Sequence, residues 1–175
     1  MFDFAQLAAH CAPQIHENTL AHVVQVESHF NPWAIGIVGG HLARQPRSEA
    51  EAIATAKSLE SQGYNYSVGL AQLNRTHFAA NGLTAETAFE PCLNLRAAAK
   101  VLEECYRRAY RRRPDEQGAL RDAFSCYYAG NFKTGYQDGY VFQVVTGRAH
   151  LKPWDTSAAG PAVAAFHSSP SALLF

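Results

Sequence analysis

The segment VVQVESHFNP, residues 23–32, contains one acid, Glu27, where an amphipathic helix would place an apolar side chain. It follows Leu20, Val23 and Val24 at the spacing i, i+3, i+4 and i+7, which puts all four on one helical face. Apolar neighbours and the nearby negative end of the helix dipole both disfavour a carboxylate, so we expect the pKa of Glu27 to be raised. A carboxyl that is partly protonated near neutral pH can act as a general acid. A glutamate that turns outward in a last helical turn is the plain structural alternative.

The segment SVGLAQLN, residues 67–74, carries a glycine and two side-chain amides close together. Gly69 lets the backbone approach another group closely, and Gln72 and Asn74 can each donate and accept hydrogen bonds. The pattern predicts a helix over residues 67–80. Taken alone, it is more typical of a packed helix end than of a binding site.

Tyrosines occur in two segments nearer the end of the chain. In CYYAGN, residues 126–131, Tyr127 and Tyr128 lie at the end of a predicted helix, beside a glycine turn that leads to Asn131. Tyr140 begins the segment YVFQVV, which alone would be ordinary core. Aromatic faces stack on pyranose rings, and amides bond sugar hydroxyl and acetamido groups. An acid, side-chain amides that follow a glycine, and several tyrosines together predict a groove that binds a sugar chain.

In this order, the segments resemble the motifs of the lysozyme-like lytic transglycosylases, specifically the short branch that accompanies type IV secretion and conjugation machines. The resemblance covers about residues 10–147. VESHFNPWAIG is similar to the family's Glu-Ser motif with its following Asn-Pro-x-Ala, and SVGLAQLN to its Gly-Leu-Met-Gln motif, with Ala71 in place of methionine. SCYYAGN is similar to its Ala-Tyr-Asn-Ala-Gly motif, with Cys126 and Tyr128 replacing the small residue and the asparagine. GYVFQVV is similar to its closing Tyr-Val motif.

The resemblance implies cleavage of the β-1,4 bond between N-acetylmuramic acid and N-acetylglucosamine in peptidoglycan. Glu27 would protonate the glycosidic oxygen and then take the proton of the C6 hydroxyl as that oxygen closes a 1,6-anhydro ring. Ser28 would orient Glu27 or the sugar. No cofactor and no metal ion would be required. The residues expected to bind the glycan, in addition to Ser28, are Gly69, Leu70, Gln72, Asn74, Tyr127, Tyr128, Asn131 and Tyr140.

The spacing of acids along the chain gives independent support. Glycosidases that work with two carboxylates need the second one roughly 5–9.5 Å from the first. The chain has no Asp between Asp3 and Asp115, and Glu49 and Glu51 lie at the start of a surface-type helix. A lone Glu suits a mechanism in which the substrate supplies the second reacting group.

Composition restricts the other classes of function. A chain of 175 residues is long enough for one domain with a sizeable core, and 47% apolar residues is ordinary for a globular protein. The formal net charge of zero argues against nucleic acid as the main partner. No apolar run approaches the roughly 18–20 residues of a membrane span. The eight histidines show no HExxH or other ligand spacing, so no metal site is expected.

Helix signals dominate, and we expect one mainly α, lysozyme-like domain over residues 1–150, with a cleft between the Glu27 helix and the later tyrosine-bearing helices. Strand signals are weak, and at most a short β-ribbon is placed at residues 34–42. Residues 151–175 are rich in Ala, Ser and Pro and are expected to form a flexible tail. Besides the helix over residues 67–80, one helix is predicted from a cap at Asn18 or Thr19 to about His29. A helix that begins at Asp115 is predicted to run through Tyr127. Three more are predicted over about residues 49–62, 94–112 and 139–148.

The four cysteines are Cys11, Cys92, Cys105 and Cys126, and none of them has a CxxC or CxxH spacing. Two disulfides and four buried thiols both remain open. Along one helix Cys105 would lie too far from Cys92 for a bridge, because bonded Cα atoms lie within about 7 Å. We favour Cys105–Cys126 across a helical hairpin, together with Cys11–Cys92.

The leading hypothesis is a periplasmic, cofactor-free peptidoglycan lyase that opens the cell wall locally for a type IV secretion or conjugation apparatus, whose components would be its partners. A muramidase, which uses water in place of the C6 hydroxyl, is the alternative among enzymes. A wall-binding assembly factor without catalytic activity is the alternative from another class. The first thirteen residues form no evident export signal. The segment RRAYRRRP, residues 107–114, is expected to be a solvated basic turn, or else a contact for acidic peptide stems or a partner protein.

Overall fold

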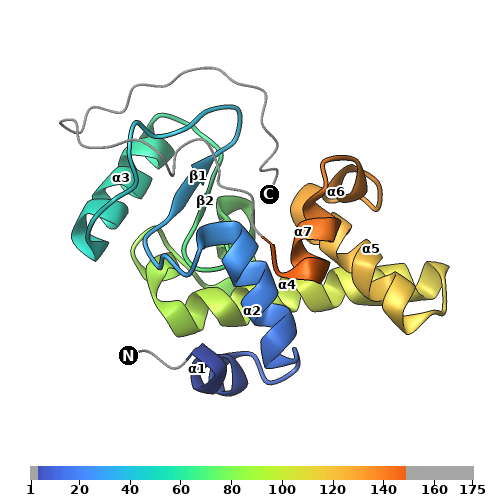
Figure 1. Cartoon of the computed structure of the whole chain (residues 1–175). Coiled ribbons are helices and arrows are strands. Elements are labelled where there is room, and N and C mark those ends of the chain that lie inside the picture. Colours follow the sequence, from blue (N-terminus) through green and yellow to red (C-terminus); the bar gives the residue numbers. More distant parts are fainter. Residues whose placement is uncertain (1–3, 149–175) are drawn as a thin grey trace.

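The structure is a computed structural model that describes residues 4–148 (Figure 1). The tail expected over residues 151–175 lies outside the described residues. Helices predominate, and a three-stranded antiparallel sheet lies beside them, which confirms the mainly α prediction. The helices are α1 (Phe4–Cys11), α2 (Glu17–Ser28), α3 (Glu49–Ser61), α4 (Pro91–Arg112), α5 (Glu116–Ala129), α6 (Thr134–Gln137) and α7 (Tyr140–Thr146). The strands are β1 (Ile35–Ile37), β2 (Tyr66–Val68) and β3 (Leu73–Asn74), and the 3-10 helices are η1 (Arg75–His77), η2 (Ala79–Asn81) and η3 (Thr87–Phe89).

The long helix α4 connects the two halves of the molecule. It begins at Pro91, which suits a first helical position because it has no N–H to satisfy there. The Glu90 carboxylate accepts hydrogen bonds from the N–H groups of Cys92 and Leu93 and so caps this end. The faces of α4 pack against two separate clusters of buried side chains. Across residues 4–148, no helix combines the length and apolar character that crossing a bilayer requires.

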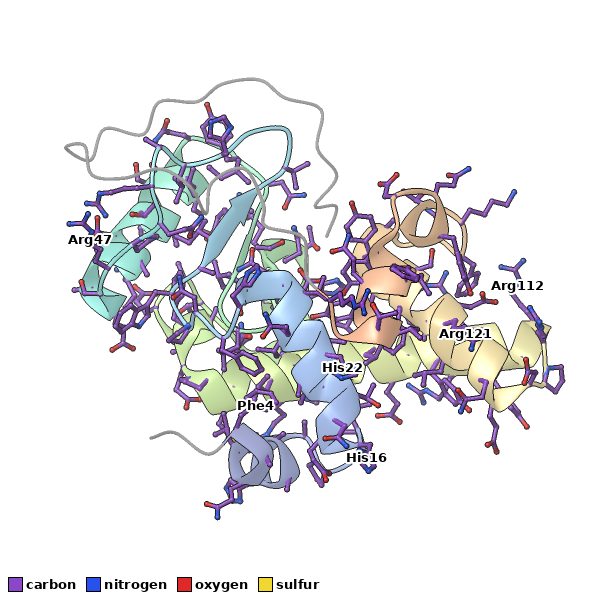
Figure 2. All side chains as sticks on the ribbon, viewed as in Figure 1. Phe4, His16, His22, Arg47, Arg112 and Arg121 are labelled. Atoms are coloured by element: carbon purple, nitrogen blue, oxygen red, sulfur yellow. A yellow bond between two sulfur atoms is a disulfide. The ribbon has the colours of Figure 1, made fainter. Side chains whose placement is uncertain are left out.

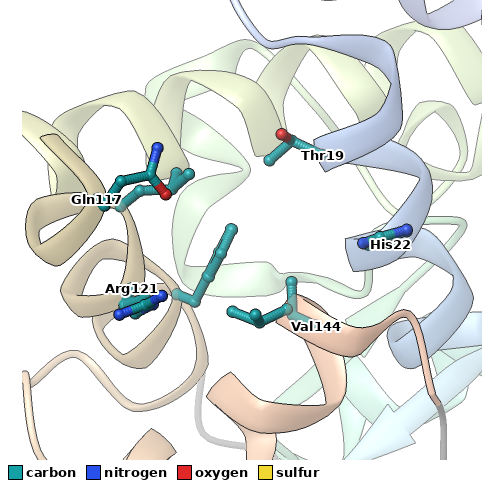
Figure 3. A pocket seen from close by; sticks show the side chains of 8 residues that line it. Thr19, His22, Gln117, Arg121 and Val144 are labelled. Atoms are coloured by element: carbon teal, nitrogen blue, oxygen red, sulfur yellow. The ribbon is translucent and has the colours of Figure 1, made fainter.

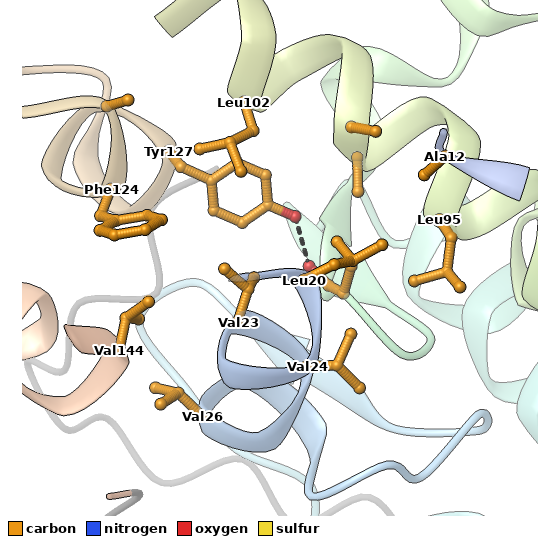
Figure 4. Close-up of a cluster of buried hydrophobic side chains, with 14 of the residues drawn as sticks. Ala12, Leu20, Val23, Val24, Val26, Leu95, Leu102, Phe124, Tyr127 and Val144 are labelled. Atoms are coloured by element: carbon orange, nitrogen blue, oxygen red, sulfur yellow. Dashed lines mark hydrogen bonds between the residues drawn. The ribbon is translucent and has the colours of Figure 1, made fainter. Parts of the chain in front are cut away.

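The helical cluster is the set of buried side chains shared by α1, α2, α4, α5 and α7 (Figure 4). On α2, Leu20, Val23 and Val24 follow the apolar spacing expected from the sequence, and all three are buried. Phe124 of α5 and Val144 of α7 pack into the same cluster. The stripe of α2 that includes the candidate acid therefore points into the protein.

The sheet cluster lies on the other side of α4, between the sheet, α3 and the 3-10 helices. β1 pairs antiparallel with β2, so that Ile35 lies opposite Val68, and β2 pairs antiparallel with β3, so that Ser67 lies opposite Asn74. The predicted ribbon at residues 34–42 contains β1, but its partner strand comes from a distant part of the chain. This sheet places the segment after β2 next to the end of α2.

Both favoured disulfides are present. Cys11–Cys92 joins the end of α1 to the start of α4, with Cα atoms 5.1 Å apart. Cys105–Cys126 joins α4 to α5 across the hairpin, with Cα atoms 5.7 Å apart. The predicted pairing is confirmed, and the alternative of four free thiols is wrong.

The helix predicted over residues 67–80 is wrong. The chain there forms β2, a tight turn, β3 and the 3-10 helices η1 and η2. Gly69 (φ 79°) and Gln72 (φ 47°) both adopt left-handed backbone conformations that an α-helix does not allow. Tertiary hydrogen bonds to this segment replace those that a helix would have made within itself.

Other element boundaries differ in smaller ways. The cap of α2 is His16, whose Nδ1 accepts a hydrogen bond from the N–H of Asn18, and neither Asn18 nor Thr19 is the cap. α7 is shorter than the helix predicted over residues 139–148, because Gly139 (φ 77°) and Gly147 (φ 64°) flank it in left-handed conformations. The short helices α1 and α6 were not predicted, since each has too few residues to show a helical period.

Candidate active site

Glu27 lies in the last turn of α2, and the residue is only 5% exposed. Its Oε1 accepts a hydrogen bond of 2.6 Å from the hydroxyl of Tyr140, the first residue of α7. The left-handed turn at Gly139 separates α7 from α6 and starts a new helix at this point. Two residues 113 positions apart in the sequence thus form one buried acid–phenol pair.

Two buried phenols face the acid. The pKa of Tyr140 and the pKa of Tyr127 are both raised well above the usual value, first by burial and then by the charge of Glu27. Both hydroxyls therefore stay protonated at neutral pH and act as hydrogen-bond donors. Tyr140 donates to the acid itself, whereas Tyr127 donates to the Ala71 carbonyl at 2.6 Å (Figure 4).

The residue after the acid connects α2 to the segment between β2 and β3. The Oγ of Ser28 donates a 2.6 Å hydrogen bond to the Leu70 carbonyl. Directly after Ser28, both His29 (φ 53°) and Phe30 (φ 61°) lie in the left-handed region, which is unusual for residues other than glycine. Strain of this kind is found at functional sites, where the surrounding structure holds the backbone. Here it turns the chain sharply away from the acid.

The Gly69–Gln72 turn, the four residues between β2 and β3, receives hydrogen bonds from several elements. Its Leu70 and Ala71 carbonyls accept from α2 and α5, as described above. The Gly69 N–H donates to the Ala34 carbonyl, and the Gln72 N–H donates to the Gly69 carbonyl. The Gln72 side-chain amide, which was expected to bind sugar, donates to the Ala34 and Gly69 carbonyls. Hydrogen bonds from α2, α5 and the segment before β1 thus fix the backbone of the turn.

Asn94 of α4 is a central residue of this site that sequence reasoning missed. Its side chain is completely buried, and its Oδ1 accepts from the Ala71 N–H at 2.9 Å. Its Nδ2 donates to the Val68 and Ala88 carbonyls, each at 2.9 Å. One amide thus satisfies three buried backbone groups. The signal was available, because Asn94 lies on the buried face of α4 four residues before Ala98, as Glu27 lies on the buried face of α2.

The second predicted amide is also used within the protein. Asn74 is completely buried, and its Nδ2 donates to the Ser67 Oγ at 3.2 Å across the β2–β3 pair. Its Oδ1 accepts from the N–H and the hydroxyl of Thr76 and caps η1. In this structure Asn74 stabilises the segment that follows the turn.

The tyrosine next to Tyr127 has a different environment. The ring of Tyr128 stacks on the ring of Tyr140, with centroids 4.5 Å apart and planes 17° from parallel. Its hydroxyl donates to Oδ2 of Asp138 at 3.3 Å, an acid that the sequence did not single out. Asn131, also expected at the sugar site, is exposed, and its Oδ1 accepts from the N–H groups of Lys133 and Thr134 at the start of α6.

Comparison with known proteins shows which family the chain belongs to. The family model described as the Transglycosylase SLT domain matches residues 5–142. This chain belongs to that family. It is 56% identical over 151 residues to the type IV secretion system protein virB1 of Brucella abortus and to that of Brucella suis. It is 37% identical over 153 residues to the protein virB1 of Agrobacterium fabrum.

These alignments cover most of this SLT-family chain but less than two thirds of each relative. The Brucella alignments cover 83% of this chain and 63% of the relative, and the Agrobacterium fabrum alignment covers 86% and 61%. The chain therefore spans about three fifths of the length of the proteins it matches. No solved structure matches it.

In this SLT domain, Gly69 is the position where an added methyl group should be most damaging. A Cβ there would lie 2.5 Å from Nδ2 of Asn94, on a backbone that already has φ 79°. We expect Gly69→Ala to lower the free energy of unfolding by at least about 2 kcal/mol, measured by urea denaturation. Gly63→Ala is the matched control, because Gly63 has φ 77° and nothing within 4 Å of its added Cβ. Equal losses in the two variants would show that the close contact with Asn94 is unimportant.

A cavity of about 170 Å³ lies elsewhere in the SLT domain, between α2, α5 and α7 (Figure 3). Apolar residues such as Leu120, Phe124 and Val144 line it together with the polar residues His22 and Arg121. It does not include the candidate acid. Within residues 4–148, no three His, Cys, Asp or Glu side chains come together in a way that could hold a metal ion.

The basic segment, residues 107–114, lies at the far end of the hairpin formed by α4 and α5, and Figure 2 shows Arg112 at this end. The guanidinium carbons of Arg108 and Arg112 lie 5.6 and 4.7 Å from the centre of the Phe132 ring. Arg107 pairs with Glu104. The arginines of this segment are exposed, as expected, but most of the segment is the end of α4, which runs to Arg112, and only its last two residues lie beyond the helix.

Proposed function

We propose that this chain is a peptidoglycan lytic transglycosylase in which Glu27 acts first as acid and then as base. The observation that carries the proposal is the 2.6 Å hydrogen bond from the Tyr140 hydroxyl to Glu27 Oε1, in a chain that belongs to the SLT family. The bond holds a buried carboxyl in one orientation. A general acid needs such fixed geometry as well as a suitable protonation state.

The reaction starts with the proton of Glu27. The carboxyl gives it to the glycosidic oxygen between N-acetylmuramic acid and N-acetylglucosamine, and the C1–O bond breaks. The C6 hydroxyl of the same muramic acid residue then attacks C1, and the Glu27 carboxylate takes its proton. The product carries a 1,6-anhydro ring, no water is consumed, and the acid returns to its starting state.

The surroundings of Glu27 suit both halves of this cycle. The Glu27 residue is buried, and burial in general favours the protonated form of a carboxyl, which the first step requires. The Tyr140 hydroxyl stabilises the carboxylate that remains after the proton has left. Ser28 and Tyr127 contribute indirectly. Their hydrogen bonds to the Leu70 and Ala71 carbonyls hold the Gly69–Gln72 turn in place. We propose that the glycan strand binds along this turn.

We further propose that the enzyme works in the periplasm and opens the wall for a type IV secretion apparatus. Relatives whose names place them in type IV secretion support this context. The two disulfides also support it, because such bonds persist in oxidising compartments. The partners would be peptidoglycan strands and components of the secretion machine.

Product masses test the proposed chemistry. The purified chain is incubated with isolated cell walls, and the released muropeptides are analysed by mass spectrometry. We expect fragments that are lighter by one water than those produced by a hydrolase, because the C6 oxygen has taken the place of water. Reducing ends without anhydro ends would identify a muramidase. Binding to walls without any released fragments would identify a wall-binding assembly factor.

A further inference from the structure

A second phenol–carboxylate contact lies directly behind the one that holds the acid. Tyr127 and Tyr128 are consecutive residues of α5, so their side chains point roughly 100° apart. Tyr127 points to the Gly69–Gln72 turn, whereas Tyr128 lies flat against the ring of Tyr140 and reaches Asp138 with its hydroxyl. Asp138, Tyr128, Tyr140 and Glu27 form one continuous series of contacts from the surface to the buried acid.

We propose that Tyr128, anchored by Asp138, is a positioning residue that sets the orientation of Tyr140 and thereby of the Glu27 carboxyl. This inference rests on the proposed function of Glu27. It gives Tyr128 a task other than the contact with sugar that was expected from the sequence. The family's Ala-Tyr-Asn-Ala-Gly motif has asparagine at the position of Tyr128. A positioning role accounts for the tyrosine here, because an amide cannot provide a flat aromatic surface for the ring of Tyr140.

The geometry gives this task a physical basis. The O–H bond of a phenol lies in the plane of its ring, so the tilt of the Tyr140 ring sets the direction of the proton it donates. A ring packed flat on another, with planes 17° from parallel, cannot tilt without losing that contact. The Tyr128 hydroxyl remains a donor, because burial and the charge of Asp138 raise its pKa. Its bond to Asp138 holds the supporting ring in turn.

The chain contains a matched control for this arrangement. Tyr136, also near the end of the chain, donates its hydroxyl to Oδ1 of Asp122 at 2.6 Å. This is a second tyrosine–aspartate hydrogen bond, in which the tyrosine is exposed, whereas Tyr128 is half-buried. Among residues 4–148, the ring stacked on Tyr140 is that of Tyr128 and not that of Tyr136, so loss of the Tyr136 side chain should leave the acid undisturbed.

The first test measures kcat and KM on soluble glycan strands for Tyr128→Leu, Tyr128→Phe, Asp138→Asn and Tyr136→Leu. We expect Tyr128→Leu to lower kcat by roughly 10–30-fold with KM changed less than about 2-fold. Tyr128→Phe, which keeps the ring, and Asp138→Asn should each lose only about 2–3-fold, and Tyr136→Leu should match the wild type. Thermal unfolding establishes that each variant is folded at the assay temperature.

Several results would overturn the inference. An unchanged kcat in Tyr128→Leu would mean that the stack has no bearing on the reaction. A raised KM with normal kcat would make Tyr128 a sugar contact. If kcat fell as far in Tyr128→Phe as in Tyr128→Leu, the ring alone would not support Tyr140.

A second measurement does not depend on turnover and so separates this inference from the proposed function. The hydroxyl proton of Tyr140 should give a slowly exchanging NMR signal, identified by its loss in Tyr140→Phe. We expect that signal to persist in Tyr128→Phe and to vanish through faster exchange with water in Tyr128→Leu. Persistence in Tyr128→Leu contradicts the positioning role, whether or not the wild type cleaves glycan.

Discussion

Replacing Glu27 by glutamine is expected to lower the rate of glycan cleavage by about 10³-fold, within the roughly 10²–10⁴-fold that a positioned acid or base contributes. Glutamine has nearly the same shape and can still accept the hydrogen bond from Tyr140, but it can neither give nor take the required proton. The measurement is release of soluble muropeptides from isolated walls over time. Binding of the variant to walls should stay close to that of the wild type.

Glu17→Gln is the matched control, because Glu17 lies in the first turn of the same helix with a side chain that is about half exposed. Its rate should equal that of the wild type. If Glu27→Gln releases muropeptides as fast as this control, the assignment of the acid is wrong. A large drop in melting temperature that affected only Glu27→Gln would also contradict it, since the loss of rate would then reflect unfolding.

Replacing Asn94 by alanine is expected to destabilise the protein by about 3–5 kcal/mol, because three buried backbone groups lose their partner at about 1–3 kcal/mol each and part of the loss is recovered by relaxation. For a chain of this size, that loss corresponds to a fall in melting temperature on the order of 10 °C. The affected groups are the Ala71 N–H and the carbonyls of Val68 and Ala88. Turnover measured well below the melting temperature should fall as well, because the Gly69–Gln72 turn loses its support from α4.

Asn81→Ala provides the comparison for this variant. Asn81 is only partly buried, and its side chain donates one hydrogen bond, to the His77 carbonyl at 2.8 Å. We expect it to cost about 1 kcal/mol or less, which is the typical net contribution of a single bond. If the two variants melt at the same temperature by differential scanning calorimetry, Asn94 does not have the central place given to it here.

The spacing of residues within single helices was enough to predict part of the fold and the burial of the candidate acid. The apolar stripe of Leu20, Val23 and Val24 placed Glu27 on a buried face, and the acid is indeed buried there. The length of the helix argued against a Cys92–Cys105 bridge, and the preferred pairing of Cys105 with Cys126 across the hairpin is present in the structure. Both inferences depend only on spacing within one helix, and such spacing can be read from a single sequence.

The contacts between distant segments could not be predicted in this way. The Gly69–Gln72 turn looked like part of a helix because its apolar residues are suitably spaced, but its conformation depends on bonds from α2, α4 and α5. Likewise, Tyr140 was expected beside a sugar, and nothing local indicates that its hydroxyl reaches Glu27. Tertiary hydrogen bonds override local propensity here, and they depend on the fold as a whole.

Because 113 positions separate the acid from its phenol partner, their contact cannot form before the chain has been synthesised as far as Tyr140. A growing polypeptide that has completed α2 and even α5 still lacks the hydroxyl that holds Glu27, because Tyr140 opens the final described helix. If Glu27 acts as proposed, a molecule that lacks Tyr140 also lacks the fixed orientation of its acid. Cleavage of glycan is then expected only from molecules in which α7 has folded against α2.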